Sequence, residues 1–89
     1  GMVMYKVIFS KKAEKHKALL KQAKLEEKVR LLLDVLAKNP FQNPPPCEKL
    51  MGDLAGVYSR RINHQHRLVY QVDETTERVF VLSMWTHYA

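Results

Sequence analysis

Five polar side chains in the second half of the chain could together cleave RNA without a metal ion. They are a glutamate, two arginines, a histidine and a tyrosine: Glu48, Arg61, Arg67, His87 and Tyr88. A carboxylate can take the proton from a ribose 2′-hydroxyl, and an imidazolium can protonate the leaving 5′-oxygen. Arginines can hold the phosphate and the charge that builds on it, and a tyrosine can stack on a base or orient the phosphate. This chemistry requires a fold that brings the five side chains to one place.

The second half of the chain is predicted to form three antiparallel strands. Runs of β-forming residues place them at residues 57–63, 66–73 and 77–86. The connections between them are short, and short connections require neighbouring strands to pair antiparallel. The last strand would then pair with the strand that bears Arg67 and carry His87 and Tyr88 to the edge of the face that holds the arginines.

Strand alternation predicts which side chains share that face. Leu68 and Tyr70 point away from Arg67, and because the apolar set must face the helices, Arg67 is expected on the open side of the sheet. Arg61 shares this side only if the hairpin loop has an odd number of residues, for example residues 63–65. A slip of one residue would turn Arg61 to the other face.

The first half of the chain is predicted to supply one strand and two helices. A short strand at residues 4–9 is followed by Ser10 as an N-cap and by a helix over residues 11–22. A second helix is expected from about residue 25 to residue 37, where Leu25, Val29, Leu32, Leu33 and Leu36 form one wide apolar stripe. We expect a break near Ala23-Lys24, because one continuous helix would be roughly 40 Å long. The fold class is therefore α+β, with both helices on one face of a mostly antiparallel sheet.

Glu48 follows a proline-rich loop. Asn39-Pro40 ends the second helix, and residues 39–47 contain all four prolines of the chain. The run Pro44-Pro45-Pro46 is expected to be stiff and extended. We therefore expect Glu48 to be held by a rigid arm.

The charge of the chain favours an anionic partner. Lysine and arginine outnumber aspartate and glutamate by 15 to 9, for a net charge of +6, and ten of these basic residues lie within residues 1–38. Such an excess favours nucleic acid first and an acidic protein second. Solubility alone is the alternative explanation.

A length of 89 residues indicates a single domain. Cys47 is the only cysteine, so no internal disulfide can form, which suits the reducing cytoplasm. No apolar run approaches the roughly 20 residues needed to span a bilayer, and no signal peptide is recognisable. Gly1, ahead of Met2, is interpreted as a remnant of cloning.

No cofactor or metal is expected, because His64-x-His66 lacks a further cluster of ligands. His16 is expected to be a partly exposed helix residue.

Two linked motifs resemble the signature of the Txe/YoeB toxins, a family within the RelE-like superfamily. The first is Leu54-Ala55-Gly56-Val57-Tyr58-Ser59-Arg60-Arg61-Ile62-Asn63, and the second is His66-Arg67-Leu68-Val69-Tyr70. The resemblance extends to Asn39-Pro40-Phe41, to Glu48-Lys49-Leu50 and to His87-Tyr88, and it covers essentially all of residues 1–89.

The resemblance implies a single RelE-like domain that acts as the toxin of a type II toxin–antitoxin pair. Such toxins are endoribonucleases that cut mRNA in the ribosomal A site, and an acidic antitoxin neutralises them. By motif position, Glu48 would be the general base and His87 the general acid. Arg67 would stabilise the phosphate with help from Arg61, and Tyr88 would position the substrate. His66 is interpreted as structural, and a homodimer is left open.

Two other functional classes stay open from the residues alone. A basic domain could hold an antitoxin or a nucleic acid without cutting it, with Glu48 on the surface and the arginines in ion pairs. A purely structural protein–protein domain would show a neutral, apolar open face, which Arg61 and Arg67 argue against.

Overall fold

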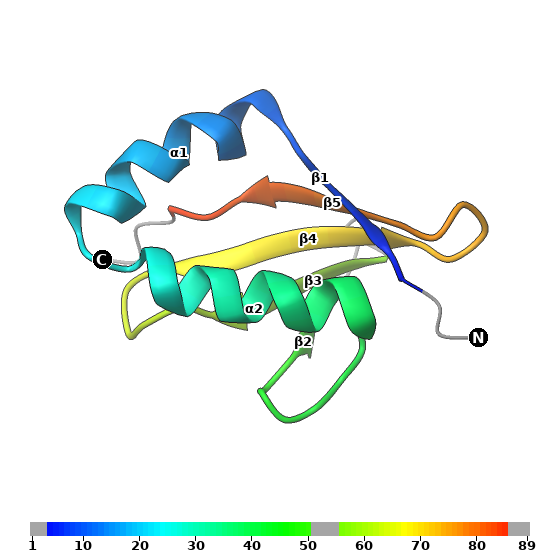
Figure 1. The fold of residues 1–89 in the computed structure, drawn as a ribbon. Coiled ribbons are helices and arrows are strands. Elements are labelled where there is room, and N and C mark those ends of the chain that lie inside the picture. The colour runs from blue at the N-terminus through cyan, green and yellow to red at the C-terminus, as the bar shows by residue number, and fades with distance from the viewer. Residues whose placement is uncertain (1–3, 51–55, 86–89) are drawn as a thin grey trace.

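The computed structural model describes residues 4–50 and 56–85, which form seven elements (Figure 1). In chain order they are β1 (Lys6–Phe9), α1 (Lys11–Gln22), α2 (Glu26–Lys38), β2 (Glu48–Lys49), β3 (Val57–Arg61), β4 (Arg67–Asp73) and β5 (Arg78–Ser83). The predicted α+β fold, with a strand, two helices and then a β-meander, is confirmed. The expected strands are each a little longer than the observed ones.

The strands form one mixed sheet in the order β1-β5-β4-β3-β2. The antiparallel meander β3–β4–β5 is its centre, as expected, and each edge carries one more strand. At one edge β1 lies parallel to β5, with Val7 opposite Val79. At the other edge the short strand β2 pairs antiparallel with β3, with Glu48 opposite Ser59. The pairing of β2 was not predicted, because a strand of two residues has no recognisable periodicity.

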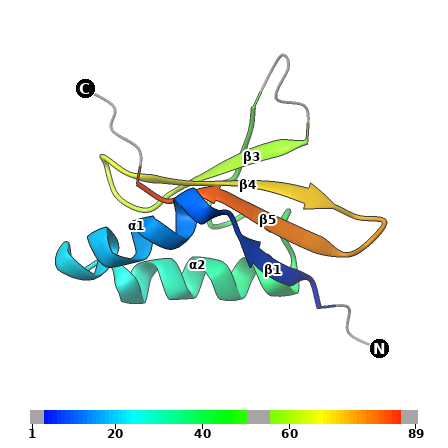
Figure 2. The ribbon, with the colours of Figure 1, turned by 90° about the horizontal axis from the view of Figure 1, so that it is seen from above.

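Both helices cover the same face of the sheet (Figure 2). The predicted apolar side chains of β4 point toward them, and Leu68 and Tyr70 are fully buried. The core joins side chains of both helices to those of the central strands and of the residues directly after them: Ala13, Leu20, Val29, Leu32, Leu36, Ile62, Leu68, Tyr70, Val79, Val81 and Met84. The face of the sheet away from this core carries Arg61 and Arg67.

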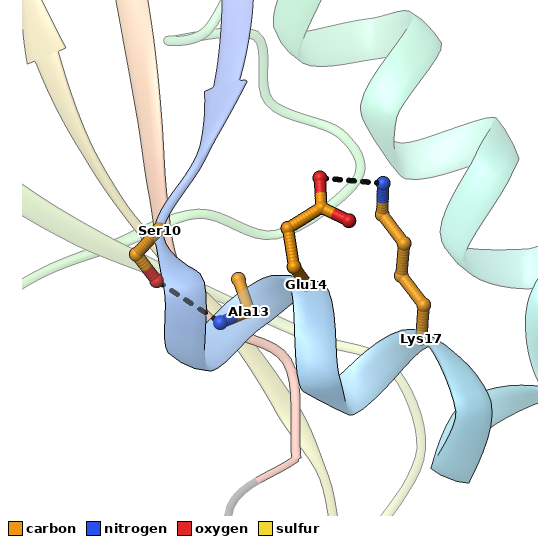
Figure 3. Close-up of polar contacts among 4 residues, drawn as sticks. All are labelled: Ser10, Ala13, Glu14 and Lys17. Atoms are coloured by element: carbon orange, nitrogen blue, oxygen red, sulfur yellow. Dashed lines mark hydrogen bonds and ion pairs between the residues drawn. The ribbon is translucent and has the colours of Figure 1, made fainter.

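Ser10 begins α1 and also ties it to the sheet. Its hydroxyl accepts a hydrogen bond from the backbone N–H of Ala13 at 3.0 Å, as expected of an N-cap (Figure 3). The same hydroxyl donates to the carbonyl of Leu82 at 2.9 Å. One turn further on, Lys17 forms an exposed ion pair with Glu14 at 3.0 Å (Figure 3).

The predicted break between the helices is confirmed at Lys24. This residue adopts the left-handed conformation, with a φ of 60°, which ends the helix in the way that glycine usually does. The N–H of Lys24 donates to the carbonyl of Lys21, and that of Leu25 donates to the carbonyl of Leu20. These two bonds satisfy carbonyls that the end of α1 would otherwise leave without a partner. Neither α1 nor α2 is long and apolar enough to cross a membrane.

Candidate nucleic-acid site

Arg61 and Arg67 lie on the same face of the sheet. They are direct cross-strand partners in the antiparallel pair of β3 and β4, and such partners project to the same side. The backbone N–H groups of Ile62 and Asn63 both donate to the carbonyl of His66. The turn is therefore closed over residues 63–65, an odd number, and the predicted register is confirmed.

Glu48 is brought to the two arginines by β2. Because Glu48 pairs with Ser59, its carboxylate projects on the same side of the sheet as the side chain of Arg67. The Nη1 atom of Arg67 lies 3.3 Å from Oε2 of Glu48 and 3.1 Å from Oγ of Ser59. The Glu48 side chain is 64% exposed and that of Arg67 only 20%. The guanidinium is thus oriented by its neighbours, and the carboxylate stays accessible to a bound molecule.

These residues line an open cleft with a volume of about 350 Å³. Its walls combine one carboxylate, two guanidinium groups, an imidazole, a buried hydroxyl and one apolar side chain: Glu48, Leu50, Ser59, Arg61, His64 and Arg67. A phosphate in this cleft would meet two positive charges, and a ribose beside it would lie within reach of a carboxylate. Of the predicted site residues, the structure brings together Glu48, Arg61 and Arg67.

Arg60, next in the chain to Arg61, points to the opposite face and is 1% exposed. Its guanidinium donates to the carbonyl of Pro45 at 2.6 Å and to that of Pro40 at 3.1 Å. Its Nε donates to the hydroxyl of Tyr70 at 3.0 Å. Arg60 therefore anchors two points of the loop that leads to Glu48. Arg60 lies within the motif Gly56-Val57-Tyr58-Ser59-Arg60-Arg61-Ile62, but the sequence did not predict its role as an anchor of the loop.

Tyr70 completes the anchor of the loop. Its hydroxyl donates to the carbonyl of Pro40 at 2.7 Å and lies 3.2 Å from Sγ of Cys47. Burial, together with the hydrogen bond to Cys47, raises the pKa of Tyr70 well above its ordinary value, although the charge of Arg60 acts in the other direction. The hydroxyl thus stays protonated and keeps its donor role at physiological pH.

The proline arm differs from the expectation in its form. The chain bends at Pro44 and Pro45, so the expectation of an extended segment is wrong there; the Asn43–Pro44 and Pro44–Pro45 peptide bonds are cis. The hydrogen bonds of Arg60 and Tyr70 hold the loop in place of an extended form.

His87 and Tyr88 lie outside the described residues. The described chain ends at Trp85, whose ring stacks on His66 with the ring centroids 3.8 Å apart. His66 is 3% exposed, which agrees with the structural role expected of it. Because His66 precedes Arg67, the stack brings the end of the described chain next to the strand that carries the cleft.

His16 also holds the end of β5. Its Nδ1 accepts a hydrogen bond from the backbone N–H of Met84 at 3.0 Å, a contact that the sequence did not predict. Burial, with a smaller contribution from Lys12, lowers the pKa of His16, so the neutral ring that can accept this bond is favoured. Among residues 4–50 and 56–85, no group of three or more His, Cys, Asp and Glu side chains could hold a metal ion.

Comparison with known proteins identifies relatives over nearly the whole chain. The family model for the YoeB-like toxin of bacterial type II toxin–antitoxin systems matches residues 10–88. Toxin YoeB of Synechocystis is 37% identical over 65 residues, which is 73% of each chain. The structure of the YoeB dimer from Staphylococcus aureus matches with a TM-score of 0.80 and 35% identity, over 96% of this chain and 99% of that one. A chain of the YoeB–YefM complex from Staphylococcus aureus matches with a TM-score of 0.78 and 36% identity, over 94% and 98%.

Proposed function

Since the chain belongs to the family of YoeB-like toxins of bacterial type II toxin–antitoxin systems, we propose that it is a ribosome-dependent mRNA endoribonuclease. It would inhibit translation in the cytoplasm by cutting mRNA in the ribosomal A site. The observation that supports this most is the contact of Arg67 with Glu48, at 3.3 Å, in a cleft that also contains Arg61. A base and two phosphate ligands in one open cleft supply the proton acceptor and the charge stabilisation that metal-independent cleavage of RNA needs in addition to a general acid.

In the proposed reaction Glu48 removes the proton from the ribose 2′-hydroxyl, whose oxygen then attacks the adjoining phosphorus. The bond from phosphorus to the 5′-oxygen breaks, and His87 protonates that oxygen as it leaves. Arg67 and Arg61 stabilise the negative charge that builds on the phosphate, and Tyr88 positions the substrate. The products are a 2′,3′-cyclic phosphate and a 5′-hydroxyl.

The chain length after β5 is compatible with the role of His87. Two residues span at most about 7 Å, so His87 stays within that distance of Trp85 along the chain. Trp85 in turn stacks on the neighbour of Arg67. This short connection supports the proposal that His87 can reach a phosphate held by Arg67.

The proposed partners are mRNA, the ribosome and an acidic antitoxin. The net charge of +6 suits all three. The staphylococcal relative has been solved both as a YoeB–YefM complex and as a YoeB dimer. We propose by analogy that this chain binds its own antitoxin and that it can form a homodimer.

The test is cleavage by the purified protein of mRNA bound to 70S ribosomes with an open A site. The proposal predicts a cut within the A-site codon, and it predicts that antitoxin blocks the cut. A basic binding module would instead bind tightly in low salt and leave the mRNA intact. Intact mRNA under conditions where the protein is bound to the ribosome would contradict the proposed activity.

A further inference from the structure

A second hollow adjoins the cleft on the side of α2. It has a volume of about 330 Å³. Four residues line both spaces, namely Glu48, Ser59, Arg61 and Arg67. The second hollow adds four more, namely Lys28 and Leu32 from α2 and Pro45 and Pro46 from the loop. A chain molecule that occupied the cleft could therefore continue into the second hollow.

The second hollow carries an excess of positive charge. The carboxylate of Glu48 is engaged by Arg67, and Glu27 of α2 is engaged by Arg30. Within residues 4–50 and 56–85, no carboxylate forms an ion pair with Lys28 or Arg61. In this part of the chain the charges of Lys28 and Arg61 are therefore not neutralised by an ion pair, and they would attract an anion into the hollow.

The remaining wall of the hollow is apolar. Pro45 is half-buried and Pro46 is exposed, and the side chain of Leu32 closes the wall from the helix, where the residue is 6% exposed. An apolar wall beside a positive charge suits a nucleotide, whose base can pack on the proline and leucine side chains by van der Waals contact while its phosphate meets the charge. The cleft itself is richer in polar groups, which suits the reacting ribose and phosphate.

We propose that the second hollow binds the nucleotide adjoining the cleaved bond, with Lys28 contacting its phosphate and Pro45 and Pro46 contacting its base. This inference rests on the proposed cleavage of RNA and adds a substrate-binding residue from α2 to it. A lysine contacts phosphate as a point charge, so loss of Lys28 should weaken substrate binding and leave the chemical step unchanged.

The experiment combines a substitution with a change in the RNA. Single-turnover cleavage is measured on 70S ribosomes with mRNA in which one phosphate beside the cut is replaced by an uncharged methylphosphonate. The linkage on the 5′ side and the linkage on the 3′ side are replaced in separate RNAs. Wild type is compared with Lys28→Gln and with Lys38→Gln, which removes an exposed lysine of α2 that does not line the hollow.

For unmodified mRNA, Lys28→Gln should lower kcat/KM about tenfold, as expected for the loss of one charge-assisted contact, with the effect in KM. One of the two methylphosphonates should lower kcat/KM about tenfold for wild type and for Lys38→Gln. The same methylphosphonate should have almost no effect on Lys28→Gln, because the contact is already absent. Thermal unfolding of Lys28→Gln should match that of wild type.

Two results would overturn the assignment. If both methylphosphonates lower the activity of Lys28→Gln as much as that of wild type, Lys28 does not contact either phosphate. If Lys28→Gln cleaves unmodified mRNA like wild type, the hollow does not contribute to binding. Failure of the proposed function can be distinguished from failure of this inference alone. In that case wild type itself would not cut unmodified mRNA, and the inference would fall with the proposed function.

Discussion

The guanidinium of Arg67 reaches the carboxylate of Glu48 at the edge of the sheet, with Nη1 3.3 Å from Oε2. The same atom lies 3.1 Å from Oγ of Ser59. The proposed base and the proposed phosphate ligand thus hold one another before any substrate is present. A bound phosphate would draw the guanidinium toward itself and leave the carboxylate next to the ribose.

Glu48→Gln is expected to separate catalysis from stability. Exposed ion pairs contribute about 0–1 kcal/mol, and the Glu48 side chain is 64% exposed, so the melting temperature should change little. Loss of the general base should lower the single-turnover cleavage rate by roughly 10²–10⁴-fold. Glu74→Gln, in the exposed turn between β4 and β5, is the control and should cleave like wild type. Cleavage by Glu48→Gln at the wild-type rate would exclude Glu48 as the base.

Arg60→Met is expected to be among the more destabilising single substitutions on the sheet. It removes the donor to the carbonyls of Pro40 and Pro45 and to the hydroxyl of Tyr70. These buried oxygen atoms would lose a hydrogen-bond donor, which should lower the free energy of unfolding by about 3 kcal/mol. Urea denaturation measures this change. Arg78→Met, on the exposed start of β5, should cost under about 0.5 kcal/mol. Equal losses for the two variants would show that the buried anchor contributes nothing specific.

His16 should make the stability of the fold depend on pH. Its pKa is lowered in the folded protein, mainly by burial, so between the lowered value and the ordinary value of 6.5 the unfolded chain binds more protons than the folded one. Neutral His16 therefore makes its full contribution to the free energy of unfolding above pH 6.5. This contribution is lost as the pH falls through the lowered pKa of His16. His16→Gln keeps an acceptor for the N–H of Met84 but does not titrate. The melting temperature of wild type relative to His16→Gln should fall between about pH 7.5 and about pH 5, and a constant difference would contradict this role.

Lys24→Gly is expected to stabilise the protein. Lys24 has a φ of 60°, a conformation that costs about 1 kcal/mol for a residue with a side chain and little for glycine. The free energy of unfolding should therefore rise by up to about 1 kcal/mol. Lys21→Gly, in the last turn of α1, is the matched control and should lower it by about 1 kcal/mol. If both variants lose stability, the side chain of Lys24 makes a contact that stabilises the fold by more than its left-handed conformation costs.

Much of the fold could be predicted because its signals are local. Strand alternation in β4 separates Leu68 and Tyr70 from Arg67, and the odd turn after β3 then determines the side on which Arg61 lies. The helix break at Lys24 was recognisable from length, although neither glycine nor proline marks it. These features depend on residues close together in the sequence.

The parts that were missed depend on contacts between distant segments. Met84 donates to His16 across the helix–sheet interface, and Arg60 binds carbonyls of a loop before it in the chain. Alternation along β3 puts Arg60 on the face opposite to Arg61, so its side of the sheet could be predicted from the sequence, but its partners could not. The pairing of β2 with β3 likewise depends on where this anchored loop delivers Glu48.

Acid–base cleavage with His87 as the acid leaves characteristic chemical ends on the RNA, and these ends can be identified directly. Wild type and His87→Gln are incubated with 70S ribosomes that carry end-labelled mRNA, and the cut ends are identified. We expect wild type to leave a 2′,3′-cyclic phosphate and a 5′-hydroxyl, and His87→Gln to bind the ribosome but to cut at least about 10²-fold more slowly. Cleavage by His87→Gln at the wild-type rate, or a wild-type product with a 5′-phosphate, would contradict this mechanism.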